Sequence, residues 1–347
     1  MNAGKPQKLT LTVPAKTMLA GEYDILTSGG EAIALALNTY LRVIITLGPQ
    51  ANEQQITVLS DYWGEGRIIT PASTDDDLLT ILIKDFILPL RKVTAVEISS
   101  QYLPSYGFGS SSALILALQT AGICISNSSA QQNYGRDSLT DVDATKLLQQ
   151  ARSTQLRFQS QASGYDLTTQ WHGGLLKLQA EPTGQLNTQA LPVPQDLDEI
   201  LHIYVGGKGA STPETMVTTC DWLTANDLHA MIRKHSRRLC ACFIDICKQQ
   251  DTTLSALIAA VAAWRQVFAF SPCFPTHIAT QLAHLHGCDQ TWTFKTSGAG
   301  GEDALLLIGQ RQAVQVADQS LRANGWHAIP YQPDNKGLTV EWSSNLP

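Results

Sequence analysis

The first hundred residues alternate between strand-like and helix-like patterns of apolar and polar positions. Residues 9–13 alternate threonine with apolar side chains, and residues 32–47 are rich in residues that favour strands. We therefore expect one strand in the first segment and one or two strands in the second. Residues 74–88 place apolar side chains at helical spacing, and Pro89 follows as a stop signal. A short strand is expected at residues 96–100.

The rest of the chain mixes strands and helices, with one change of composition. Residues 181–194 turn to proline, threonine, glycine and glutamine, so we predict a boundary between domains at residues 1–185 and 186–347. Helices are expected at residues 113–118, 139–159, 213–223, 227–248, 253–268, 276–286 and 313–324, and strands at residues 175–178, 201–205, 291–295, 304–308, 326–329 and 338–342. Because no regular strand–helix–strand repeat appears, the pattern favours an α+β fold.

Composition and charge exclude several classes of protein. A chain of 347 residues with 44% hydrophobic and 16% charged residues is globular and has the length of two domains. A net charge of −6 without a basic tail argues against a general nucleic-acid binder, although a local pocket can still bind phosphates. No apolar run approaches the roughly 20 residues of a membrane span, and residues 1–8 are too polar for a signal peptide. Seven cysteines without a CxxC pair fit reduced thiols, so we expect a cytoplasmic protein. From the charge and the lack of a long apolar run we expect no nucleic-acid and no membrane partner.

A Gly/Ser loop joins a predicted strand to the apolar helix that follows. Gly107 and Gly109 allow the backbone to approach a ligand closely, and the hydroxyls of Ser110, Ser111 and Ser112 can bond phosphate oxygens or a magnesium ion. The start of the helix adds unpaired N–H groups and the positive end of the helix dipole. The loop matches neither a Walker A motif nor a nucleophile elbow. It therefore predicts a phosphate site, with a flexible linker and helix cap as the alternative.

Three other segments carry candidate chemistry. Lys16 follows the first predicted strand among apolar residues, where it can lie near phosphates or protect a strand edge. Asp166 follows a glycine turn, where it can cap a helix or point a carboxylate into a cleft. Residues 295–303 hold more glycine than a hairpin requires. That excess indicates close approach to a ligand or to the Gly/Ser loop, with a plain hairpin turn as the alternative.

Together these segments resemble the GHMP kinase superfamily, which includes galactokinase, homoserine kinase, mevalonate kinase and phosphomevalonate kinase. Residues 14–22 match its first motif, and residues 298–301 match its third. Residues 104–111 are similar to its phosphate loop, with Phe108 in place of leucine and one residue fewer before the glycine. The resemblance implies a ribosomal-protein-S5-like N-terminal ATP-binding domain and a ferredoxin-like C-terminal domain, with the active site in the cleft between them.

The resemblance also implies a role for each matched residue, with ATP as co-substrate and Mg²⁺ as cofactor. Lys16 would lie near the γ-phosphate, and Asp166 would orient or deprotonate the acceptor, so both would be catalytic. Ser111 would be a ligand of the magnesium ion. The ATP-binding residues would be Pro104, Gly107, Gly109, Ser110, Ser111 and Ser112. The substrate-binding residues would be Glu22, Tyr23, Ser163, Gly164, Gly298, Ala299 and Gly300.

Within the superfamily the sequence is most similar to the mevalonate-pathway kinases. Residues 20–23 and 297–303 are phosphomevalonate-kinase-like, and residues 163–166 fit the Ser-Gly-x-Asp that carries the catalytic aspartate. Two positions depart from the pattern. Gln155 stands where mevalonate kinase has a magnesium-binding glutamate, and Glu302 replaces a glycine of the third motif.

The expected partners are ATP and a small anionic substrate, bound by a monomer or a homodimer. The acceptor implied by the motifs is a mevalonate-type acid, phosphomevalonate ahead of mevalonate, with Lys16, Lys208 and Arg157 as candidate cations. A sugar or homoserine kinase is the alternative within the superfamily. Outside it, the alternatives are a hydrolase that uses a loop serine with a histidine such as His172, and a nucleotide-binding regulator without catalysis.

Overall fold

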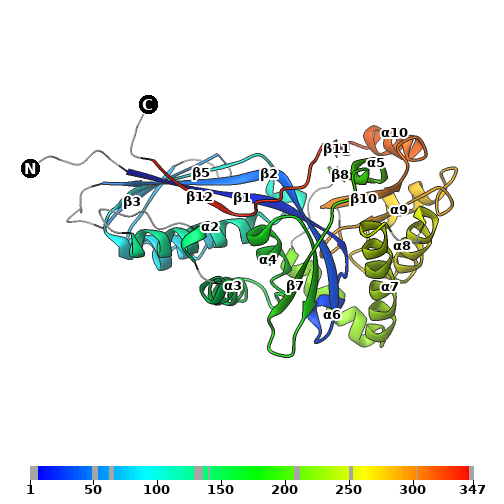
Figure 1. The fold of residues 1–347 in the computed structure, drawn as a ribbon, viewed down its shortest axis with the longest axis horizontal. Helices are drawn as coiled ribbons and strands as arrows, with labels where there is room; N and C mark the ends of the chain where they lie inside the picture. The colour runs from blue at the N-terminus through cyan, green and yellow to red at the C-terminus, as the bar shows by residue number, and fades with distance from the viewer. Residues whose placement is uncertain are drawn as a thin grey trace, which may run out of the picture.

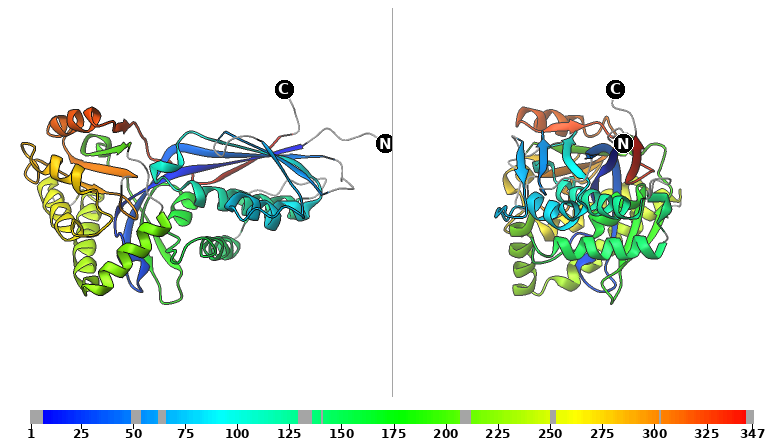
Figure 2. Two further views of the ribbon diagram at one scale, coloured as in Figure 1. Left: turned by 180° about the vertical axis from the view of Figure 1, so that it is seen from behind. Right: turned by 90° about the vertical axis from the view of Figure 1, so that its left-hand side faces the viewer.

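The computed structural model describes residues 7–48, 54–61, 66–128, 136–139, 141–206, 212–249, 253–301 and 303–343. Their strands form two sheets, which follow one another along the longest axis of an elongated molecule (Figure 1). Helices pack beside both sheets, and Figure 2 shows the same division from behind. The α+β fold expected from the sequence is therefore confirmed.

The larger sheet is built mainly from the first half of the chain. Its strands follow the order β12-β1-β2-β5-β3-β4, and β6 pairs with both β2 and β7. The strands are β1 (Gln7–Ala20), β2 (Glu31–Leu47), β3 (Ile56–Ser60), β4 (Arg67–Ile69), β5 (Val93–Ser100), β6 (Leu175–Ala180), β7 (Leu186–Leu191) and β12 (Thr339–Ser343). The long strands β1 and β2 curve from this sheet toward the second one (Figure 1), so they carry side chains to the junction between the sheets.

Helices cover one face of the larger sheet. The central one is α2 (Ser110–Asn127), whose residues are buried on nearly every side because the sheet, α3 (Asp141–Gln155) and α4 (Tyr165–His172) surround it. A helix that is apolar all round is expected to be buried in this way. α4 also packs against β1 and β2. The start of α2 and the start of α4 therefore both belong to this packed layer.

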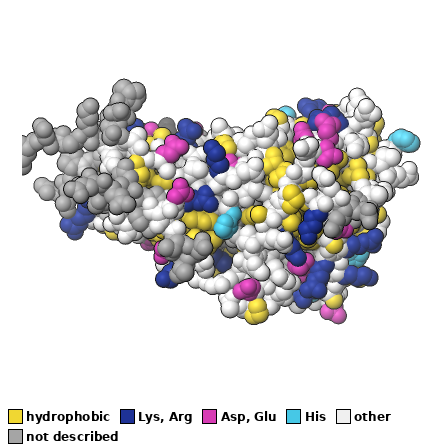
Figure 3. Space-filling view, in the orientation of Figure 1, with side chains coloured by type: hydrophobic (Ala, Val, Ile, Leu, Met, Phe, Trp, Pro, Cys, Tyr) yellow, Lys and Arg dark blue, Asp and Glu magenta, His cyan; other side chains and the backbone are white. Residues whose placement is uncertain are grey.

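The smaller sheet is antiparallel and follows the order β11-β8-β10-β9. Its strands are β8 (Leu201–Val205), β9 (Trp292–Thr296), β10 (Ala304–Gly309) and β11 (His327–Ile329). The helices of this part are α5 (Leu197–Ile200), α6 (Thr212–Ala225), α7 (His229–Cys247), α8 (Leu254–Phe268), α9 (Thr276–Ala283) and α10 (Gln315–Ala323). α8 packs on β9 and β10, and α7 packs on α8 and reaches β2. Lys and Arg side chains gather over the region of α7 on the outer surface (Figure 3).

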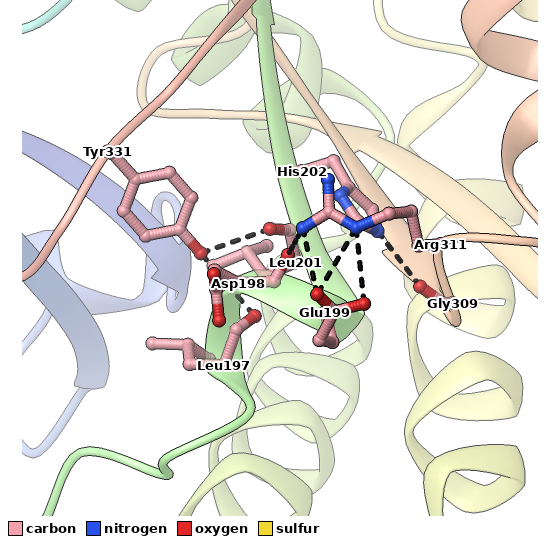
Figure 4. Close-up of polar contacts among 8 residues, drawn as sticks. All are labelled: Leu197, Asp198, Glu199, Leu201, His202, Gly309, Arg311 and Tyr331. Carbon is pink, nitrogen blue, oxygen red and sulfur yellow. Dashed lines mark hydrogen bonds and ion pairs between the residues drawn. The ribbon is translucent and has the colours of Figure 1, made fainter.

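Polar contacts at the edge of the smaller sheet hold the segment that returns to the larger one. The Tyr331 hydroxyl, which follows β11, donates to the carbonyl of Leu201 at 3.0 Å. Arg311 places its guanidinium against the carboxylate of Glu199, with N–O distances of 3.1–3.2 Å (Figure 4). The Tyr331 contact fixes the start of the path that leads from β11 to β12.

Most expected elements are present, and the differences have local causes. Lys16 lies inside β1, not after a strand, because β1 continues through two register shifts after Pro14 and after Met18. The helix expected at residues 74–88 is shorter. Asp77 caps α1 (Leu78–Leu82), which passes into a π-helical turn (Ile83–Ile87) and a 3-10 turn (Leu88–Leu90).

Two strands bear on the predicted domain boundary. β7 lies within residues 181–194 and pairs with β6 along its whole length, so this segment belongs to the larger sheet. β12 comes from the C-terminal part of the chain and pairs with β1. The division into residues 1–185 and 186–347 stays a prediction, and these pairings show that the last strand joins the first sheet.

No helix in the described ranges combines the length and the apolarity that crossing a membrane requires.

Candidate active site

Most of the residues singled out by the motifs line a single cavity of about 410 Å³. The predicted residues that line it are Lys16, Glu22, Tyr23, Pro104, Gly107, Gly109, Ser110, Ser111, Ser112, Ser163, Asp166, Gly298 and Ala299. Gly164 and Gly300 do not line it, but each is the chain neighbour of a residue that does. Motifs separated by more than a hundred residues therefore meet at one place, although the role of each residue stays a prediction.

The Gly/Ser loop forms one wall of this cavity and leads directly into α2. Gly109, at φ 82°, is the N-cap residue, and its carbonyl accepts the first helical hydrogen bond from Ala113 N–H at 2.9 Å. The N–H groups of the first turn have no acceptor within the helix. Phe108 is buried between the rings of Tyr102 and Tyr106, which anchors the loop. The helix start therefore has the features of an anion site.

The two glycines of the loop are required by close neighbours as well as by their positive φ angles. A Cβ on Gly107 would lie 2.7 Å from the Cβ of Asp303, and a Cβ on Gly109 would lie 2.8 Å from Cε of Lys16. The segment after β9 thus packs against the first loop. The glycine excess in residues 295–303 predicted close approach either to a ligand or to the Gly/Ser loop, and the approach to the loop is confirmed. The same segment is also the turn that joins the antiparallel strands β9 and β10.

Lys16 reaches the centre of the cavity from β1. Its side chain is buried, and Nζ donates to the carbonyl of Gly107 at 2.8 Å and to the hydroxyl of Tyr165 at 2.7 Å. Burial lowers the pKa of Lys16, while the nearby carboxylates of Asp166 and Asp303 oppose that shift. The ammonium is therefore positioned by two neutral oxygens and lies among acidic groups.

Asp166 is the second residue of α4, while Gly164 takes the N-cap position. Its Oδ1 accepts from the N–H of Leu167 at 2.9 Å, and its Oδ2 accepts from Nε2 of Gln155 at 2.7 Å. The carboxylate also lines the cavity. The two alternatives from the sequence, a helix cap and a carboxylate that points into a cleft, thus both apply in part. The Asp166 carboxylate bonds an N–H group in the first turn of α4 and also lines the cavity.

Gln155 is buried, and its amide has a fixed orientation. A carboxylate can only accept here, so the amide NH₂ points to Asp166 and the amide oxygen points away. That Oε1 is buried and has no hydrogen-bond partner within the described residues. Gln155 is also one of the residues that line the cavity.

Glu22 is held in a buried ion pair with Lys295. Both side chains are 0% exposed, and Lys295 also donates to the carbonyl of Thr296 at 2.7 Å and lies over the ring of Trp264. Burial raises the pKa of Glu22 and lowers the pKa of Lys295, while their mutual attraction opposes both shifts. The pair joins the segment after β1 to the smaller sheet at the edge of the cavity.

Further contacts tie the first motif to the third. Ser297 Oγ lies 2.9 Å from Thr17 Oγ1 and bonds both the N–H and the carbonyl of Met18 at 3.1 Å. The Tyr23 hydroxyl donates to the carbonyl of Ala299 at 2.5 Å. The two sheets are thereby joined by side chains from the motifs themselves.

Several residues with direct contacts at the site were not among the predicted site residues, and three of them lie within the motif segments. Tyr165, Ser297 and Asp303 all line the cavity. Each stands inside a segment that the motifs had marked, so the only available signal was position within a motif. Their partners are distant in sequence and could not be paired from the chain alone.

Two candidate residues lie away from the cavity. Arg157 forms an ion pair with Asp85, is half exposed and does not line the cavity, so the structure does not support it as a cation for the acceptor. His172 is exposed at the end of α4, and no histidine of the described chain lines the cavity, so the structure does not place the histidine of the hydrolase alternative beside the loop serines. Lys208 and Glu302 lie outside the described residues.

Comparison with known proteins gives matches among solved structures only. No protein-family model matches the chain, and comparison with curated proteins gives no match. D-glycero-D-manno-heptose 1-phosphate kinase from Bacteriodes thetaiotaomicron has a TM-score of 0.69 at 14% identity, covering 96% of this chain and 98% of its own. Streptococcus pneumoniae phosphomevalonate kinase in complex with phosphomevalonate and AMPPNP has 0.67 at 15%, covering 94% and 99%.

Lactococcus lactis galactokinase complexed with galactose has a TM-score of 0.66 at 12% identity, covering 96% of this chain and 95% of its own. The chain has the fold of these kinases. Phosphomevalonate kinase and galactokinase are both members of the superfamily that the motifs resemble. This fold extends over nearly the whole chain. The cavity lies where residues 14–22, the Gly/Ser loop and residues 298–301 meet.

Proposed function

We propose that the chain is an ATP-dependent small-molecule kinase. The observation that carries this proposal is the convergence, on one cavity, of the start of α2, the ammonium of Lys16 and the carboxylate of Asp166. Phosphoryl transfer requires positioning and charge neutralisation more than covalent chemistry from the protein. These groups supply both. The likeness to kinase structures, one of which holds AMPPNP, supports the same conclusion.

The start of α2 would bind the β- and γ-phosphates of ATP. Backbone N–H groups at Ser110, Ser111 and Ser112 are donors fixed in direction by the helix, and the helix dipole favours negative charge there. Ser111 is exposed, whereas Ser112 bonds the carbonyl of Gly109 at 2.9 Å. Ser111 is therefore the hydroxyl best placed to meet a ligand.

Lys16 and Asp166 would act on the transferred group and on its acceptor. The Lys16 ammonium stabilises negative charge on the phosphoryl oxygens, and its tether to Gly107 keeps it beside the phosphate loop. Asp166 would orient an acceptor hydroxyl and take its proton as the new O–P bond forms. An acceptor that is already an ionised phosphate needs no base, and Asp166 would then serve for positioning.

The oxygen atoms of side chains at the cavity fit a magnesium ion. Mg²⁺ binds oxygen, keeps several waters and uses one or two protein groups beside substrate phosphates. Ser111 Oγ and the Asp166 carboxylate would hold it, and the amide of Gln155 would orient that carboxylate. Within the described residues no group of three His, Cys, Asp or Glu side chains could hold a metal, which agrees with a site completed by phosphates. When bound, the ion would neutralise charge on the β- and γ-phosphates.

The motifs favour phosphomevalonate as the acceptor, with mevalonate next. This finer proposal depends on residues 20–23, 163–166 and 297–303. The fold likeness includes a phosphomevalonate kinase solved with phosphomevalonate.

The charges of the cavity favour a second candidate, a neutral sugar. Lys16 is the one cation among the described residues that line the cavity, and it faces Asp166 and Asp303 once Glu22 is paired with Lys295. The Lys and Arg side chains of α7 gather on the outer surface instead (Figure 3). The net negative charge of these residues would repel an acceptor that carries several negative charges, whereas it would not repel a neutral polyol.

Steady-state ADP formation with Mg-ATP separates these proposals. The acceptors are phosphomevalonate, mevalonate, homoserine, galactose and a heptose, each measured at a series of concentrations. Saturable turnover with any of them supports the kinase, and the highest kcat/KM identifies the class of acceptor. Turnover of a sugar without turnover of either acid rejects the mevalonate-type acceptor and keeps the kinase. Binding of ATP without any turnover would indicate a regulator that has lost catalysis.

A further inference from the structure

Tyr165 stands at the centre of the cavity without an assigned role. It is the first residue of α4, and its half-buried side chain extends to the ammonium of Lys16. Gly298 of the third motif lies on the other side, since a Cβ placed there would be 3.6 Å from the Tyr165 hydroxyl. The hydroxyl thus lies between the lysine of the first motif and the turn of the third.

The direction of the hydrogen bond follows from the chemistry of the two groups. An ammonium has three N–H donors and no acceptor, so the Tyr165 oxygen accepts from Lys16. The phenol then has its own hydrogen left to donate. Within the described residues no acceptor for that hydrogen is found, and the side chain lines the cavity. The O–H group is therefore a donor offered to whatever the cavity binds.

The position of this donor points to the phosphoryl group. Lys16 Nζ bridges the Tyr165 oxygen and the carbonyl of Gly107, at 2.7 and 2.8 Å, so the hydroxyl lies at the phosphate-loop end of the cavity. We infer that the Tyr165 hydroxyl donates a hydrogen bond to a non-bridging oxygen of the phosphoryl group in transfer. The inference rests on the proposed kinase function. A fixed donor aimed at developing negative charge lowers the barrier because it needs no reorganisation during the reaction.

Tyr165→Phe tests the inference, because it removes the hydroxyl and keeps the ring. With Mg-ATP and the acceptor identified above, kcat is expected to fall about 100-fold, the size typical of losing one fixed donor to a developing anion. The KM for ATP, the affinity for Mg-AMPPNP and the melting temperature are expected to stay as in the wild type. Tyr331→Phe is the matched control, since it removes a hydroxyl bonded to the Leu201 carbonyl (Figure 4) and neither residue lines the cavity. It should leave kcat within about twofold.

A double-mutant cycle separates direct action from action through Lys16. In a Lys16→Ala background, Tyr165→Phe is expected to lower the single-turnover rate again, by about tenfold or more, if the hydroxyl contacts the phosphoryl group itself. No further loss in that background would mean that Tyr165 only positions Lys16, and the inference would be wrong. An unchanged kcat in the single variant, or a loss of Mg-AMPPNP affinity equal to the loss of rate, would also overturn it. If the wild-type protein transfers phosphate to no acceptor, the proposed function fails and the inference fails with it.

Discussion

At the residue scale, the site depends on charged side chains that are removed from water. Lys16 and the Glu22–Lys295 pair are all buried, and each is held by specific oxygens or by an opposite charge. Buried charges are costly unless they are paired and hydrogen-bonded. A change in the protonation or in the partner of one of these groups should therefore change the activity or the free energy of unfolding.

The pH profile of kcat/KM should report the environment of Lys16. Burial lowers the pKa of Lys16, so its ammonium loses a proton at a lower pH than an exposed lysine would. Because the charged form is the one that stabilises phosphate, kcat/KM should fall on the alkaline side below the pH at which an exposed lysine titrates. Lys16→Arg, whose guanidinium stays charged, should react more slowly but lose that alkaline limb. The same limb in both proteins would show that another group titrates there.

The ion pair of Glu22 with Lys295 should be visible in the free energy of unfolding. Glu22→Gln leaves the Lys295 ammonium buried without its counter-charge, and removing one partner of a buried pair costs about 3–5 kcal/mol. Urea denaturation should show a loss of this size. The double variant Glu22→Gln with Lys295→Met should recover much of it, because no unpaired charge is left. A single variant as stable as the wild type would contradict this account of the pair.

At the scale of elements, the start of α2 leaves little room for a side chain at Gly109. Gly109 and Gly325 have the same positive φ of 82°, so an alanine is strained at either position. They differ in their neighbours, since a Cβ on Gly109 would meet Lys16 while a Cβ on Gly325 has no atom within 4 Å. We expect Gly109→Ala to weaken Mg-AMPPNP binding by about tenfold or more, and Gly325→Ala to leave it unchanged. Calorimetric titration of both variants measures the difference, and equal affinities would show that the loop does not bind the nucleotide.

The elements differ in how far the sequence could predict them. The apolar run behind the Gly/Ser loop predicts α2, because a helix buried on every side needs no polar face. β7 could not be assigned, since its polar and mostly exposed residues lack the apolar alternation of a half-buried strand. The helix at residues 74–88 was predicted too long. Its apolar residues keep a helical spacing up to Leu88, although the backbone changes from an α-helix to π and 3-10 turns.

At the scale of the whole molecule, the order of the motifs along the chain predicts the fold. It does not predict which residues of different motifs contact each other. The motifs mark the segments that surround the cavity, yet Lys16 and Tyr165 are 149 residues apart and Tyr23 and Ala299 are 276 apart. Such pairs depend on how helices and sheets pack together, which no local pattern encodes. The strand β12 is a further example, because its return to β1 is a property of the completed sheet.

Transfer of labelled γ-phosphoryl from ATP to an acceptor, by the wild type and by Asp166→Asn, tests the central claim most directly. Asp85→Asn is the matched control, because it removes a carboxylate that pairs with Arg157 away from the cavity. We predict that the wild type and Asp85→Asn label an acceptor at similar rates. Asp166→Asn should keep the affinity for AMPPNP that the wild type has without Mg²⁺ and, where the acceptor group is a hydroxyl, should label it about 10²–10⁴-fold more slowly. If neither the wild type nor the control labels any acceptor, or if Asp166→Asn labels a hydroxyl as fast as they do, the cavity does not transfer phosphate in the way proposed.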